Sequence, residues 1–238
     1  MARPAGCADS GTGIKFHGIR IRMASVILFF FDTIQMTAGN SKIALIILAA
    51  GNSSRLGKPK QLVFFNGETL LERIVRESLE SICSPIIVVT GKDSENFRHH
   101  LDASDIQIVE NKDWELGMGG SISCGTKRIL EIGEDFDGVV LCVCDQPFVK
   151  AETINNLVNI YETKKYKIVA SSYGKTLGVP ALFDKSLFAE LINLKGKNGA
   201  KRIIEKFSSE TFAVNFPEGE IDVDTEEDIE KLRKYSQG

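Results

Sequence analysis

IALIILAAGNSSRLGKPK, residues 43–60, is a continuous apolar run followed directly by a polar loop that contains glycine and basic residues. The apolar part, Ile43–Ala49, does not alternate with polar positions, which is typical of a central parallel strand buried on both faces. Ligands of open α/β sheets bind beyond the carboxyl ends of such strands. This segment therefore predicts an α/β fold with a ligand-binding loop after its first strand.

The chain beyond Ser41 alternates short apolar runs with amphipathic segments, as expected for strands joined by helices. Further strands are predicted at Ile86–Val89, Val139–Cys144, Ile106–Val109, Ile168–Ser171, Ala181–Phe183 and Phe212–Val214. Helices are predicted at Thr69–Ile82, Gly120–Ile132, Ala151–Tyr161 and after Thr225–Asp228, which has the spacing of a capping box. We expect a single α/β domain over residues 42–238, with a mainly parallel central sheet flanked by helices.

The composition is that of a soluble globular protein: 238 residues, 43% hydrophobic and 26% charged, with a net charge of -3. The slight negative charge and the lack of a long basic run argue against nucleic acid as a ligand. Neither the composition nor any long apolar run suggests a membrane protein. We therefore expect a soluble protein whose ligands are small molecules or other proteins.

The cysteines bear on the cellular compartment. Five cysteines, an odd number, do not indicate a disulfide framework, so we expect a reducing, cytoplasmic environment. Cys142 and Cys144 are two residues apart in a predicted strand and would share one face, so a metal or redox pair is one interpretation. Because neither CxxC spacing nor a nearby histidine accompanies them, we favour buried packing.

The first 41 residues differ from the rest, because they mix Gly, Pro and Arg with one short apolar stretch, Val26–Phe31. That stretch is too short to span a bilayer, and no small-residue cleavage pattern follows it as in a signal peptide. Met23 and Met36 offer alternative start sites. We expect residues 1–41 to be an extension outside the folded domain, either disordered or the result of a misassigned start.

The loop after the first predicted strand has residues suited to phosphate. Gly51 allows a close approach of the backbone, Ser53 can donate a hydrogen bond, and Arg55 and Lys60 bring positive charge. The loop is not a Walker loop, which requires Gly-Lys-Ser/Thr at the start of a helix, and it is not a GxGxxG motif, because Gly51 and Gly57 have the wrong spacing. Taken alone, it is either a triphosphate-binding loop or a solvated surface loop.

The LAAG of this loop, followed by S-x-R-L-G-x-x-K, resembles the MobA-like nucleotidyltransferase family and, within it, the molybdenum cofactor cytidylyltransferases. Further motifs occur in the order of that family and extend the resemblance over about Lys42–Leu232: Asn111, Trp114, Gly117–Ser121, Asp145–Pro147, Gly178–Pro180, Gly196–Ala200 and Asp222–Asp228. Two positions depart from its pattern. Lys197 stands where the family has an acidic residue, and Gly120 where a second serine is common, which puts acceptor recognition in doubt.

The resemblance implies a Rossmann-like nucleotidyltransferase fold, Mg²⁺ as cofactor and roles for individual residues. It implies nucleotide binding by Leu48, Ala49, Ala50, Gly51, Ser53, Arg55, Lys60, Thr90, Gly91, Asn111, Gly119 and Ser121. It also implies catalytic roles for Arg55, Lys60 and Asp145. Asp145, at the end of a central strand, and Asp222 would bind the metal, with Asp224 as the alternate, because magnesium prefers carboxylate and phosphate oxygens. Gly178 and Pro180 would bind the acceptor, and Ala49-Ala50-Gly51 resembles the cytidylyl type, which favours CTP.

We therefore expect transfer of CMP from CTP to a phosphate-bearing acceptor, molybdopterin, with release of pyrophosphate. Such an acceptor already carries an anionic oxygen, so no Ser-His-Asp set is required, and His17, His99 and His100 are expected to be structural or solvent-facing. The alternatives are GTP as donor, a sugar or polyol phosphate as acceptor, or a non-catalytic protein that binds nucleotide and serves a client molybdoenzyme. A nicotinamide oxidoreductase is disfavoured because GxGxxG is missing.

Overall fold

The computed structural model describes residues 41–51, 53, 56–92, 101 and 106–235. Of the sites predicted from the sequence, Arg55, His17, His99 and His100 lie outside the described residues, as does the segment before residue 41. The boundary between an extension and a domain near residue 42 therefore stays a prediction.

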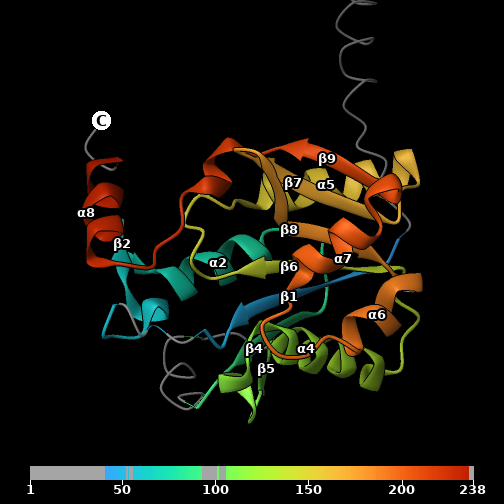
Figure 1. Ribbon diagram of the computed structural model, residues 1–238, viewed down its shortest axis with the longest axis horizontal. Coiled ribbons are helices and arrows are strands. Elements are labelled where there is room, and N and C mark those ends of the chain that lie inside the picture. The colour runs from blue at the N-terminus through green and yellow to red at the C-terminus, as the bar shows by residue number, and fades with distance from the viewer. Residues whose placement is uncertain (1–40, 52, 54–55, 93–100, 102–105, 236–238) are drawn as a thin grey trace, which may run out of the picture. The chain divides into compact units, whose positions relative to one another are not determined.

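A seven-stranded sheet forms the centre of the fold, with the strand order β5-β4-β1-β6-β8-β7-β9 (Figure 1). The strands are β1 (Ile43–Ala49), β4 (Ile86–Thr90), β5 (Ile106–Glu110), β6 (Gly138–Val143), β7 (Ile168–Tyr173), β8 (Thr176–Asp184) and β9 (Thr211–Asn215). Only β8 is antiparallel to its two neighbours, and all the other pairs are parallel. The predicted mainly parallel sheet is confirmed.

Helices cover both faces of this sheet. They are α2 (Leu70–Leu79), α4 (Met118–Ile132), α5 (Ala151–Lys164), α6 (Phe188–Ile192) and α7 (Ala200–Lys206). A further helix, α8 (Glu226–Tyr235), packs in a separate cluster, and a small hairpin is formed by β2 (Phe64–Phe65) and β3 (Glu68–Thr69). Short 3-10 turns occur at η1 (Lys60–Leu62), η2 (Trp114–Leu116), η3 (Lys185–Leu187), η4 (Ser208–Glu210) and η5 (Pro217–Glu220). No helix among the described residues has the length and apolar character that a bilayer crossing requires.

The core explains why the central strands lack polar positions. Every residue of β1 is buried, and successive side chains point to opposite faces of the sheet. Leu45 and Ile47 pack in the cluster that contains residues of α2 and α5, whereas Ile46 packs in the cluster that contains residues of α4, α6 and α7. Since each face is covered, a polar side chain at any of these positions would lose its contact with water.

A third, smaller cluster joins the C-terminal helix α8 to the loop region after β1. Val223 is fully buried there against Leu56, Val63 and Leu70, together with side chains of α8. The predicted capping box of α8 is confirmed: Asp228 N donates to Thr225 Oγ1 (3.3 Å), and Thr225 N donates to Asp228 Oδ2 (3.0 Å). This cluster holds the segment that carries Asp222 and Asp224 beside the main sheet.

Cys142 and Cys144 pack on the same side of the sheet, both almost completely buried. Burial raises the pKa of both thiols, that of Cys144 to about 12, so neither is a thiolate near neutral pH. The structure thus agrees with buried packing for this pair. No cluster of three or more His, Cys, Asp or Glu side chains in the described part of the chain is arranged to hold a metal ion by itself.

Candidate active site

The parallel strands bring the predicted site residues to one edge of the sheet. The strand order reverses between β1 and β6, whose neighbouring carboxyl ends form the switch point where α/β proteins bind ligands. In Figure 1, the arrowheads of both strands point toward the side on which α8 lies. Gly51 follows β1 and Asp145 follows β6, so residues far apart in the sequence meet there.

A buried glutamine, Gln61, shapes the loop after β1. Its Nε2 donates to the carbonyl oxygen of Ala49 at 2.5 Å and lies 3.5 Å from that of Gly51. Ser53 acts as a hydrogen-bond acceptor here, because its Oγ accepts from Lys60 N at 2.8 Å. These contacts tie the start of the loop to η1 and fix the base of the Lys60 side chain.

Gly51 lies against Lys60. A Cβ atom at position 51 would come within 3.2 Å of Lys60 Cε, so a larger residue would press on the lysine. Glycine therefore leaves room for this side chain, as well as for the phosphate group that the sequence predicts there.

The ammonium of Lys60 bridges two carboxylates. Its Nζ donates to Asp145 Oδ2 and, at 3.1 Å, to Asp224 Oδ1, and the lysine side chain is only 13% exposed. Burial works against the charged form, but the carboxylates of Asp145 and Asp224 outweigh it and raise the pKa of Lys60 above its ordinary value. Lys60 is thus a permanent cation at the switch point.

Asp222 adds a third carboxylate to this region. Burial, followed by the nearby charges of Asp145 and Asp224, raises its pKa. The backbone holds the group together, because Val223 N donates to Asp145 O at 3.0 Å. The site thus concentrates negative charge that one lysine does not fully neutralise.

This set of side chains fits a hard divalent cation. Asp145 and Asp224 already bind one positive charge, the ammonium of Lys60. Asp222 lies near Asp145, and no lysine of the described residues pairs with it. Carboxylate oxygens are the ligands that Mg²⁺ and related ions prefer, and such ions use one or two carboxylates together with substrate phosphates. Asp145, which Lys60 contacts as it does Asp224, and Asp222 stay the predicted ligand pair, with Asp224 as the alternate.

The remaining predicted nucleotide-binding residues surround the ends of β4 and β5. Thr90 is fully buried at the end of β4, and its carbonyl oxygen accepts from Asn111 N at 2.9 Å. Asn111 Nδ2 donates to Ser121 Oγ at 3.0 Å, which links β5 to the first turn of α4. The sequence thus predicted residues that the fold places side by side.

Three glycines of this region stand at close contacts. A Cβ at position 91 would lie 2.9 Å from the Trp114 ring, and one at position 119 would lie 2.7 Å from Asn198 O. Gly120 departs from the resembled family, and a Cβ there would come within 3.3 Å of Asn111 Nδ2. The tight space beside Asn111 gives a physical reason for glycine at this position.

A cavity of about 340 Å³ opens next to Asp145 and Asp222. Its wall is formed by Met118, Val143, Asp145, Gln146, Tyr173, Gly174, Lys175, Thr176, Val179, Gly219, Glu220 and Asp222. We call it the hairpin pocket, because the turn between β7 and β8 forms one side. Val179 lines it, whereas Gly178 and Pro180, the residues predicted for the acceptor, flank that residue in the chain and are not part of the wall.

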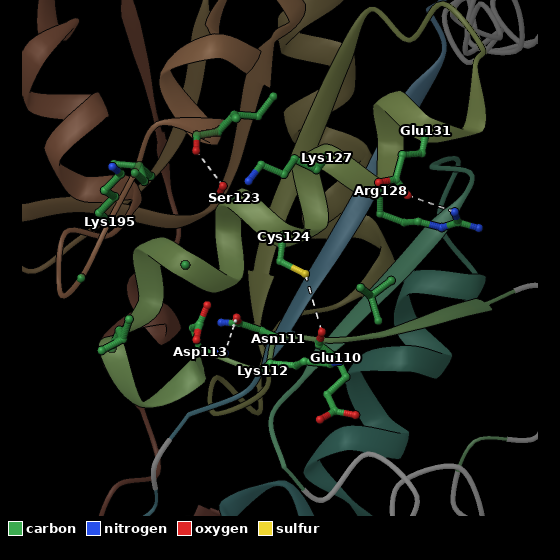
Figure 2. A pocket seen from close by; sticks show the side chains of 16 residues that line it. Glu110, Asn111, Lys112, Asp113, Ser123, Cys124, Lys127, Arg128, Glu131 and Lys195 are labelled. Atoms are coloured by element: carbon green, nitrogen blue, oxygen red, sulfur yellow. Dashed lines mark hydrogen bonds and ion pairs between the residues drawn. The ribbon is translucent and has the colours of Figure 1, made fainter.

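A second hollow, of about 470 Å³, runs along α4 and the end of β5 (Figure 2). Lys112, Lys127, Arg128 and Lys195 surround it. Arg128 is already bound, with Nε donating to Gln107 Oε1 at 2.9 Å and Nη1 lying 3.2 Å from Glu131 Oε2. This hollow borders Asn111 but contains none of Lys60, Asp145 and Asp222, so we place the chemistry at the switch point.

Three residues that the sequence did not indicate take part in the site: Gln61, Gln146 and Tyr173. Gln61 follows Lys60 and Gln146 follows Asp145, but a glutamine has no pattern that distinguishes a buried hydrogen-bonded side chain from an exposed one. Gln146 is 6% exposed, and its Nε2 donates to Gly219 O at 2.9 Å. Tyr173 reaches the site only because β8 returns antiparallel beside β6.

The fold and this site define a nucleotide-binding α/β protein, with a lysine and carboxylates at the switch point of the sheet. The sequence profile of the MobA-like NTP transferase domain matches residues 45–211, and the chain belongs to that family. Nucleotidyl transfer is the activity that this membership supports.

The chain is also similar to individual proteins. The chain is 26% identical over 199 residues to the purine catabolism protein PucB of Bacillus subtilis (strain 168), covering 79% of this chain and 95% of that protein. It is 31% identical over 137 residues to a probable UDP-N-acetylglucosamine pyrophosphorylase of Acanthamoeba polyphaga mimivirus, covering 55% of this chain and about half, 52%, of that protein.

Among solved structures, Rv0371c from Mycobacterium tuberculosis H37Rv superposes with a TM-score of 0.67 at 25% identity, covering 82% of this chain and 99% of that one. A further structure of that protein was solved in complex with manganese, and it superposes with a TM-score of 0.62 at 24% identity.

Proposed function

We propose that this protein is a magnesium-dependent nucleotidyltransferase that transfers CMP from CTP to molybdopterin, a phosphate-bearing acceptor, and releases pyrophosphate. The observation that carries the proposal is the meeting of Lys60, Asp145 and Asp222 at the switch point beside the Gly51 loop. A cation, carboxylate ligands and a glycine loop are the groups that a nucleoside triphosphate and its metal require. Family membership supports the reaction class.

In the proposed reaction, an oxygen of the acceptor phosphate attacks the α-phosphorus of CTP, and the bond between that phosphorus and the bridging oxygen to the β-phosphate breaks. Pyrophosphate leaves with the electron pair of the broken bond. Because the attacking oxygen is already anionic, no side chain has to take a proton from the nucleophile. The chain has to hold both phosphates in line and to stabilise negative charge.

The residues divide this work. Asp145 and Asp222 would hold Mg²⁺, which when bound neutralises charge on the phosphates. Lys60, freed in part from its carboxylates by that ion, would bind the triphosphate, and Gly51 would let the backbone approach it. Arg55, which lies outside the described residues, is proposed to add positive charge from the same loop. Asn111, Ser121 and Thr90 would shape the nucleoside pocket.

CTP as donor is proposed from Ala49 and Ala50, whose pattern resembles the cytidylyl type. Molybdopterin as acceptor and a client molybdoenzyme as partner are proposed from the same resemblance. Magnesium is proposed from the carboxylate ligands, and the manganese complex of Rv0371c supports a divalent ion for that protein. A cytoplasmic location is proposed from the cysteine content.

A second candidate keeps the reaction and changes the acceptor to a sugar phosphate. The similarity to the probable UDP-N-acetylglucosamine pyrophosphorylase favours this candidate, because that name describes formation of a UDP-sugar, which is a nucleotidyl transfer to a sugar phosphate. The two candidates share the nucleotide and metal side of the site, and they differ only at the hairpin pocket.

The test is a pyrophosphate-release assay with each of the four NTPs, with molybdopterin or N-acetylglucosamine 1-phosphate as acceptor, and with or without Mg²⁺. We expect release with CTP and molybdopterin that stops when EDTA removes the metal. Release with GTP alone contradicts the role of Ala49 and Ala50, and release only with the sugar phosphate selects the second candidate. CTP binding without any release would favour a non-catalytic binding protein.

A further inference from the structure

The hairpin pocket has few groups that can bind an anion. Asp145, Asp222 and Glu220 line it with negative charge, and apart from the Gln146 amide, which donates to Gly219 O, the side-chain hydrogen-bond donors come from the turn between β7 and β8, namely Tyr173, Lys175 and Thr176. An acceptor that carries a phosphate needs such donors, since phosphate oxygens only accept. The turn is therefore the part of the pocket that suits an anionic acceptor.

Two glycines position the Tyr173 ring. Tyr173 pairs with Thr176 across the hairpin, and Gly178 is its diagonal neighbour, within reach of an aromatic side chain. A Cβ atom at position 178 would overlap the Tyr173 hydroxyl oxygen and lie 3.0 Å from ring atom Cζ. A Cβ at position 219 would lie 2.6 Å from ring atom Cδ1. Only glycine at positions 178 and 219 leaves enough space for the Tyr173 ring.

The amide of Gln146 secures one of these glycines. Gln146 Nε2 donates to Gly219 O at 2.9 Å, which sets the orientation of the amide, because a flip would place two oxygens against each other. Gln146 Oε1 is buried without a hydrogen-bond partner among the described residues. A buried acceptor of this kind lowers stability, and such costs are typical of functional sites. Gln146 thus connects Asp145 to the Tyr173 ring.

The Tyr173 hydroxyl differs from that of another half-buried tyrosine, Tyr161. Tyr161 Oη lies 2.6 Å from Asp184 Oδ2 and 3.0 Å from Asp137 O, so its proton is used in a hydrogen bond within the protein. Burial raises the pKa of Tyr173, while a hydrogen bond with the Gln146 side chain works the other way, as expected when the tyrosine hydroxyl accepts that bond; no acceptor among the described residues takes the Tyr173 proton, and the ring lines the pocket. The proton of Tyr173 is therefore available to a ligand there.

We propose that Tyr173 binds the acceptor substrate, with its hydroxyl donating a hydrogen bond to an anionic oxygen of the acceptor phosphate in the hairpin pocket. This inference rests on the proposed nucleotidyl transfer and names the residue that recognises the acceptor. In it, Gly178 acts indirectly: it is a positioning residue that leaves space for the hydroxyl of Tyr173. Gly178 was predicted to bind the acceptor, but it does not line the hairpin pocket. In this role it would affect acceptor binding through Tyr173.

The first test is Tyr173→Phe, which removes the hydroxyl and keeps the ring. We expect the KM for molybdopterin to rise about 10-fold or more, the size of a hydrogen bond to a charged group, while the KM for CTP stays unchanged. Calorimetric titration of molybdopterin should show the same loss of affinity. Tyr161→Phe is the matched control, because it removes a hydroxyl far from the pocket and should leave both KM values unchanged.

The second test is a double-mutant cycle with Gly178→Ala. Alone, this substitution should raise the KM for molybdopterin as Tyr173→Phe does, because the new methyl group displaces the hydroxyl. In the Tyr173→Phe background the added effect of Gly178→Ala should be smaller, because the overlapping oxygen is gone. If Gly178→Ala instead damaged the structure of the hairpin, its effect on KM would add fully to that of Tyr173→Phe, and both KM values would rise.

The inference is contradicted if Tyr173→Phe binds molybdopterin as tightly as the wild type and keeps its KM. It is also contradicted if both KM values rise together or if the two substitutions are additive. These results leave the wild-type reaction intact and so differ from failure of the proposed function, in which the wild type itself releases no pyrophosphate. If the wild type also fails to bind molybdopterin, both proposals fall.

Discussion

The two ends of strand β6 carry polar clusters of similar size but opposite character. Before the strand, the hydroxyl of Tyr161 lies against Asp184 and the carbonyl oxygen of Asp137, and Asp184 Oδ1 accepts from Ser186 N at 2.8 Å. After the strand, Asp145 stands with two further carboxylates and Lys60. In the first cluster the hydrogen-bond donors are paired with acceptors, whereas the second cluster has excess negative charge.

The pKa values express this difference. Burial works against the charge of Asp184, but hydrogen bonds from Ser186 and Tyr161 outweigh it and lower the pKa of that carboxyl group. Burial and neighbouring carboxylates instead raise the pKa of Asp222. The folded state therefore favours the charge on Asp184 and disfavours the charge on Asp222. A cluster that lowers stability in this way is a candidate for function, since binding of a cation would relieve it.

The largest expected effect is on turnover, from Lys60→Ala. We expect pyrophosphate release to fall by about 10²-fold or more, because a preorganised positive charge is lost from the site. Lys58→Ala is the matched control, since Lys58 Nζ lies on the surface, 2.8 Å from Glu226 Oε1, and its loss should change turnover little. Equal rates for Lys60→Ala and wild type would remove Lys60 from the mechanism.

A pair of Asp→Asn substitutions compares the two clusters directly. Asp222→Asn should lower turnover about 10-fold to 100-fold through weaker metal binding, yet raise Tm, because one of three repelling charges is gone. Asp184→Asn should lower Tm and leave turnover unchanged, because a matched acceptor is lost far from the site. Calorimetry and the release assay measure both effects. If both variants lost stability, Asp222 would be a structural residue like Asp184.

A smaller effect is expected from Tyr161→Phe. This variant loses the part-buried hydrogen bond to Asp184 and keeps the ring, so the free energy of unfolding should fall by about 1 kcal/mol. For a domain of this size, that change corresponds to a Tm lower by about 2–4 °C. Turnover should stay at the wild-type value. A larger fall in turnover than in stability would show that the two ends of β6 are coupled.

The smallest effect is a change in the pH dependence of stability. Because the folded-state pKa of Asp184 is lowered, its contribution is fully present above the unfolded pKa of about 3.9 and is lost as the pH falls through the folded value. Tyr161→Phe removes one hydrogen bond that lowers this pKa. Its Tm should therefore fall less than that of the wild type between pH 5 and 2. Parallel curves for the two proteins would contradict the role of Tyr161.

The strands illustrate which parts of the fold a local pattern predicts. Ile43–Ala49 was predicted with its observed bounds, because both of its faces are buried and the apolar run is uninterrupted. The helix predicted for Thr69–Ile82 instead spans Leu70–Leu79, with Thr69 as its cap, because a stripe of apolar residues does not mark where hydrogen bonding stops. The hairpin of β2 and β3 and the helices α6 and α7 were not predicted, since they are short and carry little periodicity.

Strand β8 is the largest departure. The sequence predicted Ala181–Phe183, whereas β8 spans Thr176–Asp184 and inserts antiparallel between β6 and β7. Its first half is only partly buried, so it lacks the apolar run by which a central strand is recognised. The order of strands depends on packing between residues that are distant in the chain, and no local pattern contains that information.

The candidate site likewise contains residues that the sequence predicted and residues that it did not. Lys60, Asp145 and Asp222 were expected from the glycine loop after the first strand, from carboxylates near strand ends and from the resemblance to the MobA-like family, and their roles stay predictions. Gln61 and Gln146 were not, because their role comes from burial against carbonyl oxygens of other segments. Arg55 and the boundary near residue 42 lie outside the described residues and stay predictions.

By itself, the sequence determined the α/β class, the central strands and the loop at Leu48–Lys60, because hydrophobic periodicity and turn residues act over a few positions. Only the tertiary structure decided that Lys60 pairs with Asp145 and Asp224, and that Tyr173 lines a pocket together with Asp145 and Asp222. The Lys60 contacts join segments that are 85 and 164 residues apart in the chain. They follow from how the strands are ordered, which depends on the free energy of the whole core.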